Sequence, residues 1–208
     1  MEAAEGLMRR GKMRAMTSST GRGEWWHFVR GFLRAPRTVG SVAPSSRYLV
    51  TAMLDAAQVE HRHVMAEFGP GTGVFTTEIV RRMRSDARLL VFEVDGGFVA
   101  RLRQRVRDPR VTIIQGSAAD LKQHLLALGT DQVDCIVSGL PFTSLPREVT
   151  HGILQTTREC LAPGGLFVTY QYTPMLLRLL RTYFPVMRIA KVVLLNLPPA
   201  MVLVCAAP

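Results

Sequence analysis

The sequence predicts an α/β protein built on a mostly parallel β-sheet with helices on both faces. Short apolar runs alternate with segments of helical periodicity from His63 to Phe184. The apolar runs are nearly continuous, which is typical of strands buried on both faces of a parallel sheet. Two more apolar runs surround Pro198-Pro199 near the C-terminus, and they predict a hairpin that closes the sheet.

The expected elements follow one another in strand–helix order. Residues 1–22, rich in Gly, Ser, Thr, Met and Arg, predict a poorly ordered arm. A helix is expected to end at Gly164, because glycine commonly terminates helices. We expect strands at 63–68, 88–94, 110–115, 133–141, 166–174 and twice within 188–207, and helices at 74–84, 98–107, 119–128, 147–165 and 174–184.

Composition narrows the class of protein. A chain of 208 residues fits one domain with a real core. Its net charge of +10 favours an anionic partner, such as nucleic acid, an anionic membrane or an acidic small molecule. Cys135, Cys160 and Cys205 lie among apolar residues without a CxxC pair, which predicts buried, reduced thiols in a cytoplasmic protein. No apolar run reaches the ~18 residues of a membrane span, so any membrane contact is expected to be peripheral.

A glycine loop, Gly69-Pro70-Gly71-Thr72-Gly73, lies between the first strand and the first helix of this pattern. This is the position of a nucleotide-binding loop in a doubly wound fold. Val74 stands where a dinucleotide fingerprint needs its last glycine, and the Lys-Ser/Thr of a phosphate-binding loop is missing. Glu67, just before the loop, favours a ligand with an ammonium or a sulfonium. Glu93 ends the second strand, where it can accept hydrogen bonds from both hydroxyls of a ribose.

The motifs "EFGPGTG" and "VFEVD" resemble those of the class I S-adenosylmethionine-dependent methyltransferases, over about residues 38–206. The resemblance implies a Rossmann-like fold with a seven-stranded sheet, S-adenosylmethionine as methyl donor and S-adenosylhomocysteine as product. Many members carry Asp where Ser117 stands, so Ser117 is expected to accept more weakly from the adenine amino group. The implied cofactor contacts are Glu67, Gly69, Gly71, Thr72, Gly73, Glu93, Ser117, Ala118 and Ser138.

The segment "VSGLPF" at the end of the fourth strand is similar to the (Asp/Asn)-Pro-Pro-(Tyr/Phe) motif of amino-methylating enzymes, with Ser138 in place of the acid or amide. The resemblance implies that carbonyls of this loop hold the accepting amine. Aromatic faces would stabilise the methylated cation, and Tyr170 and Tyr172 share one face of the fifth strand. The implied catalytic residues are Tyr48, which follows the segment "APSS" that lies over the cofactor in the resembled family, Ser138, Gly139, Leu140, and Phe142, which stacks beside the amine.

Together with "FLRAPRTVGSVAPSSRYL" and "NLPPAMV", these motifs look like those of the bacterial phospholipid N-methyltransferases. These enzymes convert phosphatidylethanolamine to phosphatidylcholine, and close relatives methylate ornithine lipids. Ribosomal RNA adenine dimethyltransferases carry a similar fourth motif, although no helical RNA-binding domain is expected after the hairpin. A cofactor-binding protein without catalysis is a third alternative, because Ser138 departs from the usual acid or amide. No metal ligand set is expected.

The segment "EWWHFVRGFLRAP" predicts a short amphipathic helix with tryptophans on its apolar stripe and arginines opposite. Such a helix suits the headgroup zone of an anionic bilayer, and packing on its own sheet is the alternative. We therefore expect a membrane-docking arm at 1–37, a methyltransferase domain at 38–208 and a cytoplasmic protein held peripherally at the membrane. The implied membrane contacts are Trp25, Trp26, Phe28, Arg30, Phe32 and Arg34.

Overall fold

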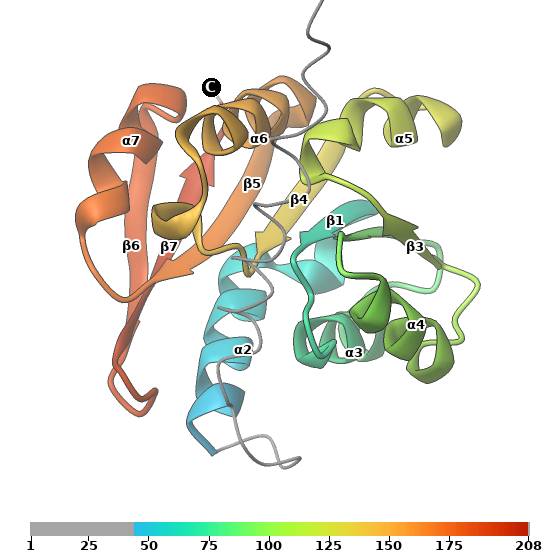
Figure 1. Cartoon of the computed structure of the whole chain (residues 1–208), viewed down its shortest axis with the longest axis horizontal. Coiled ribbons are helices and arrows are strands. Elements are labelled where there is room, and N and C mark those ends of the chain that lie inside the picture. Colours follow the sequence, from blue (N-terminus) through green and yellow to red (C-terminus); the bar gives the residue numbers. More distant parts are fainter. Residues whose placement is uncertain (1–43, 208) are drawn as a thin grey trace, which may run out of the picture. The chain divides into compact units, whose positions relative to one another are not determined.

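A seven-stranded sheet in the order β3-β2-β1-β4-β5-β7-β6 forms the centre of the structure, a computed structural model that describes residues 44–207 (Figure 1). Strands β1 to β5 run parallel, and β7 lies antiparallel between β5 and β6. This confirms the mostly parallel sheet with a C-terminal hairpin. The strands are β1 (Val64–Phe68), β2 (Arg88–Glu93), β3 (Val111–Gln115), β4 (Val133–Ser138), β5 (Leu161–Gln171), β6 (Val186–Val193) and β7 (Ala200–Ala206).

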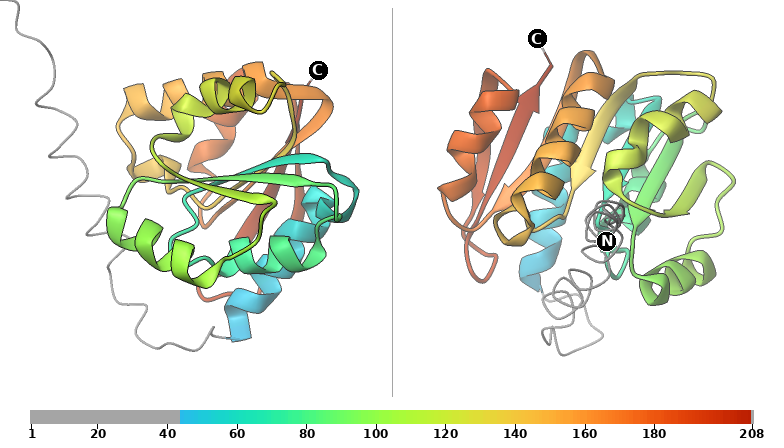
Figure 2. Two further views of the ribbon diagram at one scale, coloured as in Figure 1. Left: turned by 90° about the vertical axis from the view of Figure 1, so that its right-hand side faces the viewer. Right: turned by 45° about the horizontal axis from the view of Figure 1, so that its top comes forward.

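Helices cover both faces of this sheet, as the sequence predicts (Figures 1 and 2). One face carries α2 (Pro44–Ala57), α3 (Val74–Arg82) and α4 (Gly96–Arg105). The other face carries α5 (Leu121–Ala127), α6 (Arg147–Cys160) and α7 (Met175–Tyr183). Single 3₁₀ turns connect some of these elements: η1 (Val59–His61), η2 (Ala118–Asp120) and η3 (Phe142–Ser144). Within residues 44–207 no helix is long and apolar enough to span a bilayer.

Each sheet face contributes to a closely packed apolar layer. On the α2–α3 side, Met53 and Leu54 of α2 pack with Ile79 of α3 against strand residues such as Val137. Full burial of one such side chain contributes about 1.5–3 kcal/mol. The three cysteines are buried and free, which confirms their reading as unpaired core thiols. Burial raises the pKa of Cys135 to about 12, so this thiol stays protonated at neutral pH.

The end of α6 differs from the prediction. The helix stops at Cys160, and Leu161 already pairs with Val133 in the sheet, so the predicted helix end at Gly164 is wrong. Pro163 disfavours helical backbone in the residue before it, which explains the early stop. Gly164, at φ +72°, instead belongs to an irregular first part of β5, where the register with β4 shifts.

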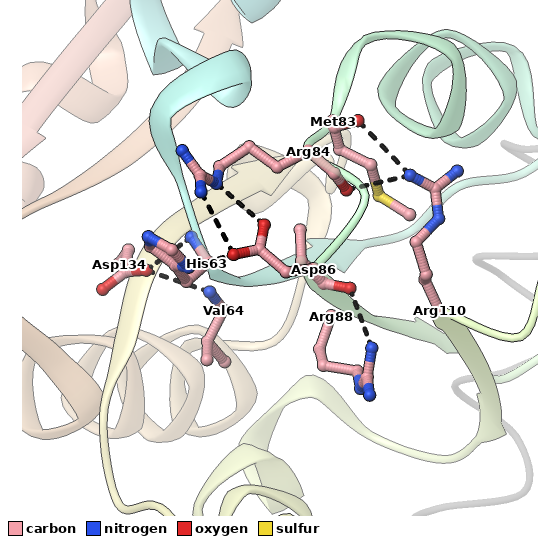
Figure 3. Close-up of polar contacts among 9 residues, drawn as sticks. His63, Val64, Met83, Arg84, Asp86, Arg88, Arg110 and Asp134 are labelled. Carbon is pink, nitrogen blue, oxygen red and sulfur yellow. Dashed lines mark hydrogen bonds and ion pairs between the residues drawn. The ribbon is translucent and has the colours of Figure 1, made fainter.

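Polar side chains make hydrogen bonds to the backbone at the edge of the sheet where the parallel strands begin (Figure 3). One carboxylate oxygen of Asp134 accepts the backbone N–H groups of His63 at 2.8 Å and Val64 at 2.9 Å. Arg110 donates to the carbonyls of Val80, Met83 and Arg84 at 3.2, 3.3 and 2.9 Å. These carbonyls lie at the C-terminal end of α3, where helix carbonyls lack intrahelical partners. Arg110 therefore caps α3 from the beginning of β3.

Replacing this cap tests its structural role. Arg110→Ala leaves the carbonyls at the end of α3 without their charged donor, and we expect the free energy of unfolding in urea to fall by about 2 kcal/mol. The exposed Arg107 lies in the same connection, so Arg107→Ala is the control and should change stability by less than about 0.5 kcal/mol. Equal stability of the two variants would contradict the capping role.

Candidate functional site

The carboxyl ends of the parallel strands bring the predicted site residues to one edge of the sheet. Phe68, at the end of β1, pairs with Phe92 of β2 on one side and with Ser138 of β4 on the other. Glu93 at the end of β2 pairs with Gln115 of β3. The strand order reverses direction at β1, and ligands of open α/β sheets bind at such a switch point. The glycine loop, Glu93, Ser117 and the loop after Ser138 therefore surround one place.

Each glycine of the loop between β1 and α3 is required for a reason that the geometry shows. Gly69, Gly71 and Gly73 have φ angles of +66°, +55° and +79°, the left-handed region that favours glycine. A Cβ on Gly69 would lie 2.7 Å from the Leu140 side chain, and one on Gly73 would lie 2.5 Å from that of Leu102. A Cβ on Gly71 would meet no atom of the described residues within 4 Å. The backbone at Gly71 is thus open to a ligand.

The carboxylate of Glu93 is held by backbone N–H groups. One oxygen accepts from Val94 and Asp95, both at 2.9 Å, and the other from Gly71 at 3.2 Å. Burial raises the pKa of Glu93, and these three donors oppose the rise. A carboxylate offers about four acceptor positions, so one is left for a ligand hydroxyl. The prediction was that Glu93 accepts from both ribose hydroxyls. For that, the Gly71 N–H would have to give up its hydrogen bond to the carboxylate.

Glu67 is a buried carboxyl without a hydrogen-bond partner of ordinary geometry among the described residues. It is 1% exposed and follows Ala66 in the middle of the sheet. Burial raises the pKa of Glu67 to about 8, the nearby Thr76 lowers it by a smaller amount, and the charge of Glu93 raises it further. A cationic group that reached this carboxyl would compensate the cost of its burial.

Ser117 and Ala118 lie next to Glu93, after β3. The carbonyl of Glu93 accepts the N–H of Gly116, which fixes the turn. The Ser117 hydroxyl accepts the N–H of Ala119 at 3.2 Å at the start of η2, and its own hydrogen is available as a donor. The adenine contact of Ser117 and Ala118 stays a prediction, and accepting from an adenine amino group would use the second lone pair of the Ser117 hydroxyl.

The loop after β4 contacts the glycine loop directly. The N–H of Gly139 donates to the Phe68 carbonyl at 2.8 Å, and a Cβ on Gly139 would lie 2.8 Å from the Gly69 carbonyl oxygen. Ser138 is fully buried, and its hydroxyl accepts the N–H of Leu140 at 3.3 Å. Its carbonyl accepts from the Thr169 hydroxyl at 3.3 Å. The loop after β4 is thus in backbone contact with the glycine loop and is tied to β5.

Aromatic side chains flank this loop in an arrangement that the sequence predicts only in part. Tyr170 and Tyr172 share one face, as predicted, with ring centroids 5.6 Å apart. Phe75, in the first turn of α3, stacks on Tyr170 at 6.4 Å. Phe75 was not among the predicted site residues, although its place just after the glycine loop was a usable signal. Tyr48 is 52% exposed on α2, which begins at this same edge of the sheet (Figure 1).

Phe142 lies in the core rather than on an open surface. Its side chain is 3% exposed, and its ring meets that of Phe167 edge to face at 6.1 Å. The Thr150 hydroxyl donates to its carbonyl at 3.4 Å, which ties η3 to α6. Stacking beside an acceptor amine would require the ring to turn away from Phe167.

Three of the described histidines, His61, His63 and His151, are exposed. His124 is half-buried, and its ring meets that of Phe92 edge to face at 5.4 Å. The part of the chain that the structure describes contains no group of three or more His, Cys, Asp or Glu suited to a metal ion. The predicted membrane contacts, Trp25, Trp26, Phe28, Arg30, Phe32 and Arg34, lie outside the described residues. The groups present therefore fit S-adenosylmethionine: an unpartnered buried carboxyl, an open glycine backbone and one remaining acceptor position on Glu93.

The raised pKa of Glu67 gives a pH dependence that can be measured without ligand. An unfolded Glu ionises near pH 4.5, whereas Glu67 in the fold ionises near pH 8. Between these values only the unfolded chain loses the proton, so this residue lowers stability by up to about 1.4 kcal/mol per pH unit as the pH rises. We expect Glu67→Gln to unfold in urea at higher concentration than the wild type at pH 8, with the difference vanishing toward pH 4.5.

A control with the opposite sign is available on α3. Arg81 lowers the pKa of Glu78, so Glu78→Gln should lose a little stability at neutral pH rather than gain it. A Glu67→Gln variant that is equally or less stable than the wild type at pH 8 would contradict the assignment of Glu67 as a buried, protonated carboxyl.

Comparison with known proteins agrees with this geometry. A family model described as a methyltransferase domain matches residues 65–165. The structure of the N-methyltransferase NodS from Bradyrhizobium japonicum, in complex with S-adenosyl-L-homocysteine, superposes with a TM-score of 0.66 at 16% identity, over 88% of this chain and 98% of that one. The Thermus thermophilus 16S rRNA methyltransferase RsmC gives a TM-score of 0.60 at 21% identity, over 83% of this chain and 45% of that one. These structures share the fold.

Proteins related in sequence indicate which group of methyltransferases the chain belongs to. Ribosomal RNA small subunit methyltransferase A of Aromatoleum aromaticum is 31% identical over 109 residues, which are 52% of this chain and 38% of that protein. Ornithine lipid N-methyltransferase of Singulisphaera acidiphila is 33% identical over 145 residues, which are 69% of this chain and 76% of that protein. With the shared fold and the matched domain, this second relationship shows that the chain belongs to the class I S-adenosylmethionine-dependent methyltransferases, in the family of the bacterial lipid N-methyltransferases.

Proposed function

We propose that the chain methylates the amino group of a membrane lipid. The observation that carries this proposal is the direct contact between the glycine loop and the loop after β4, at Gly69 and Gly139. The first loop resembles the loop that binds the cofactor in class I methyltransferases. The second resembles the loop that holds an acceptor amine in amino-methylating enzymes. Their contact leaves no protein layer between donor and acceptor, as a direct transfer requires.

Two headgroups are candidates for the acceptor. The relative from Singulisphaera acidiphila is an ornithine lipid N-methyltransferase, which supports ornithine lipid. The "SGLPF" and "NLPPAMV" motifs resemble those of the enzymes that convert phosphatidylethanolamine and its mono- and dimethyl forms to phosphatidylcholine. Both headgroups carry a primary amine, so the same chemistry serves either lipid.

The residues of the chain have distinct parts in this proposal. S-adenosylmethionine, when bound, supplies a sulfonium methyl group, which an uncharged amine can attack directly with sulfur as the leaving group. Glu93 and Ser117 would hold its ribose and adenine, and Glu67 would face its positive charge. Thr72 and Gly73 complete the loop that positions it.

The acceptor amine must lose a proton to solvent before transfer. Desolvation among the half-buried Gly139 and Leu140 lowers the pKa of an amine, so a separate general base is not required. The carbonyls of Ser138 and Leu140 orient the nitrogen, and Tyr172 and Tyr48 present aromatic faces to the cation that forms. Each transfer adds one methyl and releases one proton.

We also propose that the protein works at the cytoplasmic membrane surface, where residues 1–37 form the docking arm that their pattern predicts. The tryptophans would sit at headgroup level, and Arg30 and Arg34 would each add about 1 kcal/mol of attraction to anionic lipid. The net charge of +10 supports such a partner.

A ribosomal RNA adenine is the second candidate acceptor, supported by the relationship to ribosomal RNA small subunit methyltransferase A. That relationship covers 38% of the relative, and it therefore reflects mainly the shared cofactor domain. RNA belongs in the experiment as a competing acceptor.

Transfer from labelled S-adenosylmethionine tests the function. The full chain is incubated with vesicles containing phosphatidylethanolamine, with vesicles containing ornithine lipid, and with ribosomal RNA. We expect methylated lipid, and product mass identifies the headgroup and the number of methyl groups. Labelled RNA without lipid product, or no transfer to any acceptor, would overturn the proposal.

A matched pair of glycine variants links the activity to the loop contact. Gly139→Ala places a Cβ against the Gly69 carbonyl and separates the loops, so we expect a rate at least about 100-fold lower. Gly152→Ala, in α6 where a Cβ meets none of the described residues within 4 Å, should keep the wild-type rate. Equal rates for both variants would show that the contact does not position the reactants.

A further inference from the structure

The tip of the β6–β7 hairpin carries three leucines that are among the most exposed large apolar side chains of the described residues. Leu197 is 89% exposed, Leu194 74% and Leu195 64%. The hairpin tip, defined as Leu194–Pro199, has the sequence Leu-Leu-Asn-Leu-Pro-Pro and no charged side chain. Isolated apolar residues are normal on a protein surface, but a group of this kind marks an interaction site.

Hydrogen bonds within the hairpin tip hold it in a defined conformation. Asn196 is buried, and its side-chain amide donates to the Pro198 carbonyl at 2.7 Å. The Asn196 N–H donates to the Val193 carbonyl at 3.2 Å, and Val193 and Ala200 are buried where the strands enter the tip. The polar residue of the loop thus points inward while its three leucines point to solvent.

The hairpin tip projects from the edge of the sheet that carries the candidate site. Because β7 is antiparallel to both β5 and β6, the end of β6 lies at the same edge as the end of β5. Gln171, the last residue of β5, pairs with Met201, so the tip extends beyond the strand end that leads to Tyr172. Tyr172 and Met175, which follow β5, are also exposed. Figures 1 and 2 show the hairpin extending beyond the end of β5.

Basic side chains accompany this apolar tip. Lys191 is exposed on β6, an edge strand of the sheet, three residues before Leu194, and Arg188 is exposed further back on the same strand. Apolar residues that enter the acyl boundary with basic residues at headgroup level are the composition of an interfacial anchor for an anionic bilayer. The chain as a whole carries a net charge of +10, which also favours an anionic surface.

We propose that the hairpin tip is a membrane-docking element that inserts Leu194, Leu195 and Leu197 into an anionic bilayer. Docking by this tip turns the edge with the glycine loop, Tyr172 and the loop after β4 toward the lipid. The choice of a bilayer as the partner of the tip rests on the proposed function. The exposure of the three leucines is a property of the structure and holds without that proposal.

Insertion is measured directly with a fluorophore. Leu195→Cys is labelled in the full chain with nitrobenzoxadiazole, which the buried native cysteines do not take up readily. Vesicles of phosphatidylglycerol and phosphatidylcholine in equal parts should shift its emission to the blue. Leu126→Cys on α5, with a similar exposure of 60%, should show no shift. Vesicle binding without a shift at position 195, or no vesicle binding at all, would overturn the proposal.

Serine variants measure the contribution of the tip. The triple variant Leu194→Ser, Leu195→Ser, Leu197→Ser should bind these vesicles at least about tenfold more weakly. Leu126→Ser with Leu128→Ser removes exposed leucines from α5 and should bind as the wild type does. If the triple variant instead loses a dimer seen by light scattering and keeps its vesicle affinity, the tip is an interface between copies and the docking proposal fails.

The failure of docking is distinguishable from the failure of the proposed function. Transfer to a short-chain lipid dissolved as monomers needs no docking, so the triple variant should keep the wild-type rate on that acceptor. Vesicle insertion without transfer to any lipid would overturn the proposed function alone. Transfer to dissolved and vesicular lipid at equal rates in wild type and variant would overturn docking alone.

Discussion

The close approach of the backbone after β1 to the backbone after β4 is the constraint on which the site depends. Gly139 donates to the Phe68 carbonyl at 2.8 Å, and neither Gly69 nor Gly139 has room for a Cβ. The two strands are neighbours only because the sheet order reverses at β1. Parallel pairing brings the strand ends to one edge, and the glycines let the loops touch there. In the proposed function this contact would place the methyl donor beside its acceptor.

Two buried carboxyls give this edge its electrostatic character within a basic protein. Glu93 is stabilised by three backbone donors, whereas Glu67 has no comparable partner among the described residues and is held protonated by burial. Burying such a group costs stability in the absence of ligand. A cationic cofactor offsets that cost when it binds, so the same feature that weakens the empty fold favours the ligand.

Much of the fold follows from local patterns, and the rest depends on tertiary contacts. The strands, the two helical layers and the C-terminal hairpin were predictable because buried parallel strands are continuously apolar. The glycine loop and Glu93 were predictable from their spacing. The end of α6 was misplaced because sheet pairing of Leu161 outweighed the Gly164 signal. The burial of Phe142 against Phe167 and the exposure of the hairpin leucines depend on partners distant in sequence, which no local pattern contains.

Calorimetric titration of S-adenosylmethionine into the wild type and into Glu93→Gln tests the central claim most directly. A neutral amide cannot accept from the three backbone N–H groups and a ribose hydroxyl as the carboxylate does, because its nitrogen donates. We expect saturable binding to the wild type and a dissociation constant at least about tenfold higher for Glu93→Gln, since hydrogen bonds to charged groups contribute about 1.5–3 kcal/mol. Equal affinity of the two proteins, with unchanged circular dichroism, would contradict this claim.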